Sequence, residues 1–166
     1  MNRLGIAALL LLAACGPEWT NGRRAITQPR SLHVCAKVPY EHMPAVEEAV
    51  AEWAHALEGW RQIELSDSSC DITIEQVPAD AYPGTWIGEA NELGGNIVRL
   101  RAGAYERRAT DVVSHELGHI FGAQHVPSGL MASDLDRVPR ACPDSTTMAQ
   151  VAAYQRISLE ILKWCY

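Results

Sequence analysis

The sequence predicts an α/β domain, in which short strands alternate with amphipathic helices. Three observations lead to this prediction. The chain has 166 residues, which is enough for one domain with a sizeable core. Apolar residues recur with a period of two in several short segments and with a helical period in longer ones. The order along the chain is strand, helix, four strands and helix, which favours helices layered on a sheet over an all-helical bundle.

The first strand and the first helix are expected near the start of the domain. Apolar residues alternate over residues 32–38, which indicates a half-buried strand that Pro39 ends. Pro44 suits the first position of a helix, where a missing N–H costs nothing. Apolar residues then recur at intervals of four and three up to about residue 59, so we expect one buried helical face. The residues on this face are Val46, Val50, Trp53, Leu57 and Trp60.

Four short strands and two helices are expected in the rest of the chain. A loop at 78–84 and a turn at 91–95 separate the last three strands. One further helix is predicted at 107–121, and a last helix extends from the N-capping residues 144–147 to about Lys163. The expected strands are residues 63–65, 72–77, 85–90 and 97–100.

The second predicted helix contains three histidines and one glutamate in the pattern H-E-x-x-H-x-x-G-x-x-H. His115 and His119 lie one turn apart on one helical face, so both imidazoles can reach one metal ion. Glu116 can point at a water molecule on that ion. Gly122 allows the chain to leave the helix with a positive φ, and His125 can then return as a third ligand. Three nitrogen ligands and one open position are typical of a catalytic zinc site.

This extended pattern is far more specific than its first five residues. From the composition of the chain, a bare H-E-x-x-H is expected by accident in roughly one or two chains per hundred, whereas the full pattern is expected in roughly a few in 10⁵. The other histidines lack ligand spacing, so we expect them to be surface or packed residues. These are His33, His42 and His55.

A methionine follows the third histidine at a short distance. Met131 comes six residues after His125, in the segment Ser-Gly-Leu-Met-Ala. Over residues 115–131 the chain resembles the metzincin zinc metalloendopeptidases, and it is most similar to compact, matrixin-like bacterial domains. The resemblance implies one catalytic Zn²⁺ on the three histidines, Glu116 as the general base, and Met131 as a soft apolar floor beneath the imidazoles. It also implies hydrolysis of peptide bonds in extended polypeptides by attack of a zinc-activated water.

The same resemblance implies a zincin-like arrangement of the predicted elements. We expect a five-stranded mixed, twisted sheet with an antiparallel edge strand and two helices packed on it, within an N-terminal subdomain of residues 31–125. A small C-terminal subdomain, residues 126–166, would hold the last helix. No second zinc is expected, because the loop at 78–84 is short. The edge strand, to which an extended substrate could add through main-chain hydrogen bonds, would be Thr85, Trp86, Ile87, Gly88, Glu89 and Ala90.

The first thirty residues are predicted to lie outside the domain at 31–166. Arg3 precedes an apolar stretch that ends in small residues directly before Cys15, as in a bacterial lipoprotein signal peptide. Residues 1–14 would then be removed, Cys15 lipidated, and residues 15–30 left as a flexible tether. An ordinary secretion signal cleaved nearby is the alternative. We therefore expect an exported, membrane-anchored lipoprotein that faces the periplasm or lies on the cell surface.

With Cys15 lipidated, four cysteines remain to pair, and an even number in an exported chain predicts two disulfides. Three connectivities are possible. The first two cysteines lie on strands that we expect to be neighbours, which would allow them to pair. The last two flank a predicted helix, so their pairing would require the flanking segments to fold back. The four residues are Cys35, Cys70, Cys142 and Cys165.

Charge and partners complete the prediction. The net charge is −6 at pH 7, and no basic cluster exceeds two adjacent arginines, so we do not expect nucleic acid as a partner. We expect a monomer whose partners are a polypeptide substrate and, through the lipid, a membrane. Two other functions stay open: a zinc hydrolase of cell-wall peptides, and a non-catalytic zinc-binding surface lipoprotein. Glu116 argues against the second, because a structural site needs no general base.

Overall fold

The computed structural model describes residues 31–81, 86–91, 93–134 and 142–165 of the chain. The predicted signal peptide and tether, the lipidation site Cys15, and Thr85 lie outside these residues. Within the described residues, no helix is long and apolar enough to cross a membrane.

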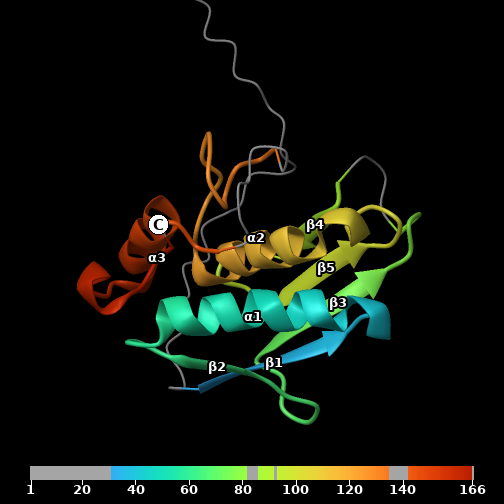
Figure 1. Cartoon of the computed structure of the whole chain (residues 1–166), viewed down its shortest axis with the longest axis horizontal. Helices are drawn as coiled ribbons and strands as arrows, with labels where there is room; N and C mark the ends of the chain where they lie inside the picture. The colour runs from blue at the N-terminus through green and yellow to red at the C-terminus, as the bar shows by residue number, and fades with distance from the viewer. Residues whose placement is uncertain (1–30, 82–85, 92, 135–141, 166) are drawn as a thin grey trace, which may run out of the picture.

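Five strands form one mixed sheet, as Figure 1 shows. They are β1 (Ser31–Lys37), β2 (Gln62–Leu65), β3 (Ile72–Val77), β4 (Gly88–Ala90) and β5 (Ile97–Arg101). Their order is β2-β1-β3-β5-β4. The first four strands in this order are parallel, whereas β4 pairs with β5 in the antiparallel direction at one edge. The α/β class, the mixed five-stranded sheet and its antiparallel edge strand are therefore as predicted from the sequence.

Two helices lie side by side across one face of the sheet, α1 (Met43–Leu57) and α2 (Ala109–Phe121). A third helix, α3 (Ser145–Gln155), lies at one side of the molecule (Figure 1). Three short 3₁₀ turns complete the described elements: η1 (Tyr40–His42), η2 (Glu106–Arg108) and η4 (Leu159–Ile161). Because η2 occupies the residues before Ala109, α2 begins two residues later than predicted.

The core lies between the sheet and its two helices. Leu32 and Val34 of β1 point into it, and their neighbours in sequence are less buried, as the alternating pattern predicts. Trp53 of α1 is completely buried, and its indole Nε1 donates a hydrogen bond of 2.9 Å to the carbonyl of Ser114 in α2. The ring of Trp53 also lies 4.8 Å from that of Phe121. Trp53, on the apolar face of α1 predicted from the sequence, therefore holds α2 in place at Ser114, the residue before His115.

Two further predicted boundaries differ in the structure. Trp86 and Ile87 do not belong to β4, which begins only at Gly88. The N–H of Arg101 donates to the carbonyl of Ile87, and the chain turns directly after Arg101. Strand β5 therefore offers no backbone partner to the residues before Ile87. The last helix ends at Gln155 and does not continue to residue 163.

A left-handed residue causes the early end of α3. Arg156 has a φ of 57°, and the N–H of Ile157 donates to the carbonyl of Ala152, which closes the helix. The chain then returns along α1, where Leu162 is buried and the N–H of Lys163 donates to the carbonyl of Ala56. We call residues 157–165 the C-terminal strap.

The chain contains two disulfides, and the C-terminal strap explains the second. Cys35 pairs with Cys70 across a Cα–Cα distance of 5.3 Å, and Cys142 pairs with Cys165 across 6.1 Å. The second pair forms because the chain after α3 folds back, which brings the N–H of Cys165 within 3.1 Å of the carbonyl of Pro143. Two disulfides are typical of an oxidising, extracellular environment.

Candidate metal centre

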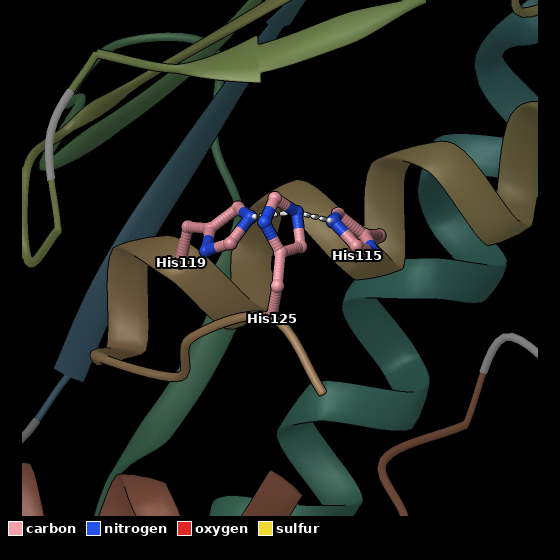
Figure 2. A group of neighbouring side chains, drawn as sticks. All are labelled: His115, His119 and His125. Carbon is pink, nitrogen blue, oxygen red and sulfur yellow. Dashed lines mark hydrogen bonds between the residues drawn. The ribbon is translucent and has the colours of Figure 1, made fainter. Parts of the chain in front are cut away.

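Three histidines from α2 and the segment after it converge on one point (Figure 2). His125 Nε2 lies 3.1 Å from His115 Nε2 and 3.3 Å from His119 Nε2. A zinc ion bound to nitrogen at about 2.0–2.1 Å in a tetrahedron places its ligand atoms about 3.3–3.4 Å apart, so the observed spacing fits a shared metal ion. The sequence prediction that these three residues form one group is confirmed.

The protonation of the rings supports the same conclusion. His115 Nδ1 donates to the carbonyl of Leu130 at 2.7 Å, and His119 Nδ1 donates to that of Ala123 at 2.8 Å. In a neutral imidazole that donates through Nδ1, the Nε2 atom carries a lone pair. Both lone pairs face the Nε2 atom of His125, so three ring nitrogens surround one point. This donor set can therefore hold a metal ion.

The imidazoles are held in the form that binds metal. Burial lowers the pKa of His115 to about 4. Burial, together with the two neighbouring imidazoles, lowers the pKa of His119 to about 3. Burial also lowers the pKa of His125. All three rings are therefore neutral at pH 7, as metal ligation requires.

Gly122 creates the corner that returns His125 to the helix. It ends α2 with a φ of 101°, the positive φ expected from the sequence, and its N–H donates to the carbonyl of His119 at 3.0 Å. The N–H of Ala123 donates to the carbonyl of Gly118 at 2.8 Å. A residue with a side chain would be strained in this conformation.

Met131 lies in a tight turn beneath the helix that carries the ligands. It is completely buried, and a Cβ atom at Gly118 would overlap its Sδ atom. Gly118 stands between the two helical ligands, so the thioether packs against the backbone of α2 at that level. The N–H of Val126 donates to the carbonyl of Met131 at 2.9 Å, which closes the loop that carries the third ligand.

Asp144 holds this turn from α3, and sequence reasoning missed that role. One carboxylate oxygen caps α3 by accepting from the N–H of Thr147 at 2.9 Å, as the predicted N-cap requires. The other accepts from the N–H of Leu130 at 2.8 Å. The capping pattern is visible in the sequence, but the second bond joins residues fourteen positions apart and leaves no local signal.

Glu116 lies between α2 and the edge strand β4. Its side chain is buried, and burial raises its pKa to about 8, with Glu89 adding to the effect. The backbone N–H of Ala90 donates to the carboxyl group and opposes this rise. A Cβ atom at Gly88 would lie 3.1 Å from Glu116 Oε1 and 2.8 Å from Val112 Cγ1, so any larger residue there would force these side chains to shift.

The register of β4 determines which backbone groups face outwards. Ile87 accepts from Arg101, and Asn91 donates to Ile97, so alternate residues of this segment bond to β5. Gly88 and Ala90 lie between these positions, and their N–H and C=O groups point away from β5. The described part of the predicted edge thus presents the backbone of these two residues beside Glu116. The side chain of Glu89 instead pairs with Arg99 at 3.2 Å.

The other predicted positions lie elsewhere. His33 pairs with Glu64 and Asp71, His42 contacts the ring of Tyr105, and His55 lies near Glu58, so none of these histidines joins the centre. Glu52, Cys142 and Cys165 form a second group at metal-binding distances. The two sulfur atoms of this group are joined in a disulfide, which removes them as thiolate ligands.

Comparison of the chain with protein-family models finds no match, and comparison with curated proteins finds none either. The chemistry of this site is therefore inferred from its geometry alone.

Proposed function

We propose that the protein is a zinc-dependent metalloendopeptidase of the metzincin type. One observation carries this proposal: the Nε2 atoms of His115, His119 and His125 meet at zinc-binding distances, and the buried carboxyl of Glu116 belongs to the residue next to the first ligand. The buried Met131 beneath the ligand helix and the antiparallel edge strand β4 agree with the resemblance to metzincins.

Zinc bound at this centre supplies a Lewis acid that polarises the scissile carbonyl and lowers the pKa of water to about 7. Glu116 takes a proton from the attacking water and later delivers it to the leaving amine. In the metal-free protein burial raises the pKa of Glu116 to about 8, and the positive charge of a bound zinc ion would favour the ionised carboxylate that accepts a proton. A purely structural three-histidine site has no use for a buried carboxyl group here.

The substrate is an extended polypeptide that adds to the free edge of β4. The outward-facing N–H and C=O groups of Gly88 and the C=O group of Ala90 can pair with a peptide backbone, whereas the N–H of Ala90 is bonded to Glu116. Because Ala90 also bonds to Glu116, a peptide on this edge lies beside the group that moves the proton. This arrangement favours hydrolysis of a main-chain amide over chemistry on a small molecule.

The protein acts outside the cytoplasm, tethered to a membrane by lipid on Cys15. Support comes from the two disulfides and from the sequence before Cys15, in which a short apolar stretch ends in small residues.

The activity is tested with residues 16–166 and an unstructured protein substrate such as casein. We expect about one zinc per chain, cleavage of casein, loss of cleavage with a chelator and its return with added zinc. Zinc-loaded protein that cleaves neither casein nor any member of a peptide library would overturn the proposal.

A further inference from the structure

Side chains of helix α3 bind the backbone of residues 121–124, the corner between His119 and His125. Gln150 Oε1 accepts a hydrogen bond of 2.5 Å from the N–H of Gln124, the residue directly before His125. Five residues further along the helix, Gln155 Nε2 donates 3.2 Å to the carbonyl of Phe121, the last residue of α2. Two side chains of α3 therefore hold the two ends of this corner.

Tyr154 holds the middle of the same corner. Its ring packs on Gly122 so closely that a Cβ atom there would overlap ring carbons, and its hydroxyl donates 3.2 Å to the carbonyl of Leu93. The next residue, Gly94, donates its N–H to the carbonyl of His119 at 2.9 Å. The tyrosine ring thus links the corner to the turn between β4 and β5.

The corner needs such support for two reasons. The last carbonyls of a helix have no intrahelical partner, and Gln155 supplies one to Phe121. A glycine in the left-handed region has more backbone freedom than any other residue. If the corner at Gly122 moved, the ring three residues later would leave the other two imidazoles, and metal binding would have to order it again.

We propose that Gln150 and Tyr154 are positioning residues for the metal ligand His125, and that helix α3 thereby sets the metal affinity of the centre. The proposal rests on the zinc centre proposed above but not on peptide hydrolysis. Neither residue belongs to the ligand pattern or lies near it in the sequence. Loss of groups that orient metal ligands typically weakens metal binding 10- to 100-fold, which sets the expected size of the effect.

The test measures zinc affinity by competition with a chromophoric chelator and the visible spectrum of the Co²⁺-substituted protein. Gln150→Ala and Tyr154→Leu should each weaken zinc binding by about tenfold or more and shift the Co²⁺ spectrum towards that of His125→Ala. Gln150→Glu, which keeps an acceptor oxygen, and Tyr154→Phe, which keeps the ring, should remain within about threefold of the wild type. Gln62→Ala, a matched change at an exposed position of β2, should have no effect.

Each outcome decides the proposal. Zinc affinity and Co²⁺ spectra of Gln150→Ala and Tyr154→Leu equal to the wild type would overturn it, as would equal weakening by Gln62→Ala. If Tyr154→Leu fails to fold, the comparison of Gln150→Ala with Gln150→Glu still decides, because Gln150 is only half-buried and its partner Gln124 is exposed. If the wild-type protein bound no zinc, both the proposed zinc centre and this proposal would be overturned. Zinc binding without peptide hydrolysis would remove only the proposed activity.

Discussion

The Nδ1 atom of His115 lies 2.7 Å from the carbonyl oxygen of Leu130. This bond joins a candidate metal ligand on α2 to the residue before Met131, and it fixes both the tautomer and the direction of the ring. The N–H of the same leucine is held by Asp144. The orientation of the first ligand therefore depends on a side chain from the start of α3, twenty-nine residues after it in the sequence.

Replacement of Asp144 should affect both stability and metal binding. In Asp144→Ala, the N–H groups of Leu130 and Thr147 lose their acceptor. We expect a loss of about 1 kcal/mol in the free energy of unfolding from the missing cap, and zinc binding about tenfold weaker. Asp144→Asn keeps one oxygen for the cap, so it should restore more of the stability than of the zinc affinity. Urea unfolding and zinc titration measure the two effects, and unchanged zinc affinity in Asp144→Ala would refute this role.

Replacement of Gly88 should disturb Glu116 without removing a metal ligand. A Cβ atom at this position would press on Val112 and on the carboxyl of Glu116. Gly88→Ala should lower the free energy of unfolding by about 1–3 kcal/mol, as overpacking typically does. It should also lower kcat by at least about tenfold while the zinc content stays near one per chain. Full activity of this variant would show that the close contact does not position the carboxyl group.

The raised pKa of Glu116 predicts a pH-dependent stability of the metal-free protein. Its pKa is about 8 in the folded chain and 4.5 in the reference state, so between these values the folded state binds more protons than the unfolded state. The contribution of the neutral carboxyl group to stability is therefore complete below about pH 4.5 and is lost as the pH rises to about 8.

Glu116→Gln removes this titration. Its stability relative to the wild type should rise between pH 5 and pH 8, by up to about 1.4 kcal/mol per pH unit. Urea unfolding in the presence of a chelator measures the difference at pH 5, 6.5 and 8. A difference that does not change with pH would mean that the carboxyl group titrates normally.

The lipid anchor is tested separately from the metal centre. Expressed in a bacterial host from its first residue, the wild-type chain should fractionate with membranes, because lipidated Cys15 would retain it. Cys15→Ser should release the protein into the soluble exported fraction with its zinc content unchanged. Membrane fractionation of this variant equal to that of the wild type would exclude the anchor.

Local patterns in the sequence were sufficient to predict the cluster of three histidines and most of the elements. The spacing of His115, His119 and His125 and the glycine after the helix depend on the geometry of a single helix and its end. The buried faces of β1 and α1 follow from periodicity for the same reason. The class of the fold could therefore be predicted without knowledge of distant contacts.

Features that depend on distant contacts could not be predicted. The Cys142–Cys165 pair can form because α3 ends at Gln155. The helix ends there because Arg156 adopts a left-handed conformation, and no glycine or proline at this position predicts that end from the sequence. The close packing of Glu116 on Gly88 joins residues twenty-eight positions apart and leaves no local signal in the sequence. The contacts of Gln150 with Gln124 and of Tyr154 with Gly122 also join segments that only the tertiary fold brings together.

The central claim is that the three histidines and Glu116 form a catalytic zinc centre, and Glu116→Gln tests it most directly. Zinc content and cleavage of casein are measured on the same purified samples of wild type and variant. The account predicts about one zinc per chain in both proteins and cleavage by the variant that is about 10²- to 10⁴-fold slower, because only the group that moves the proton has changed. Equal cleavage by the zinc-loaded variant and the wild type would contradict it.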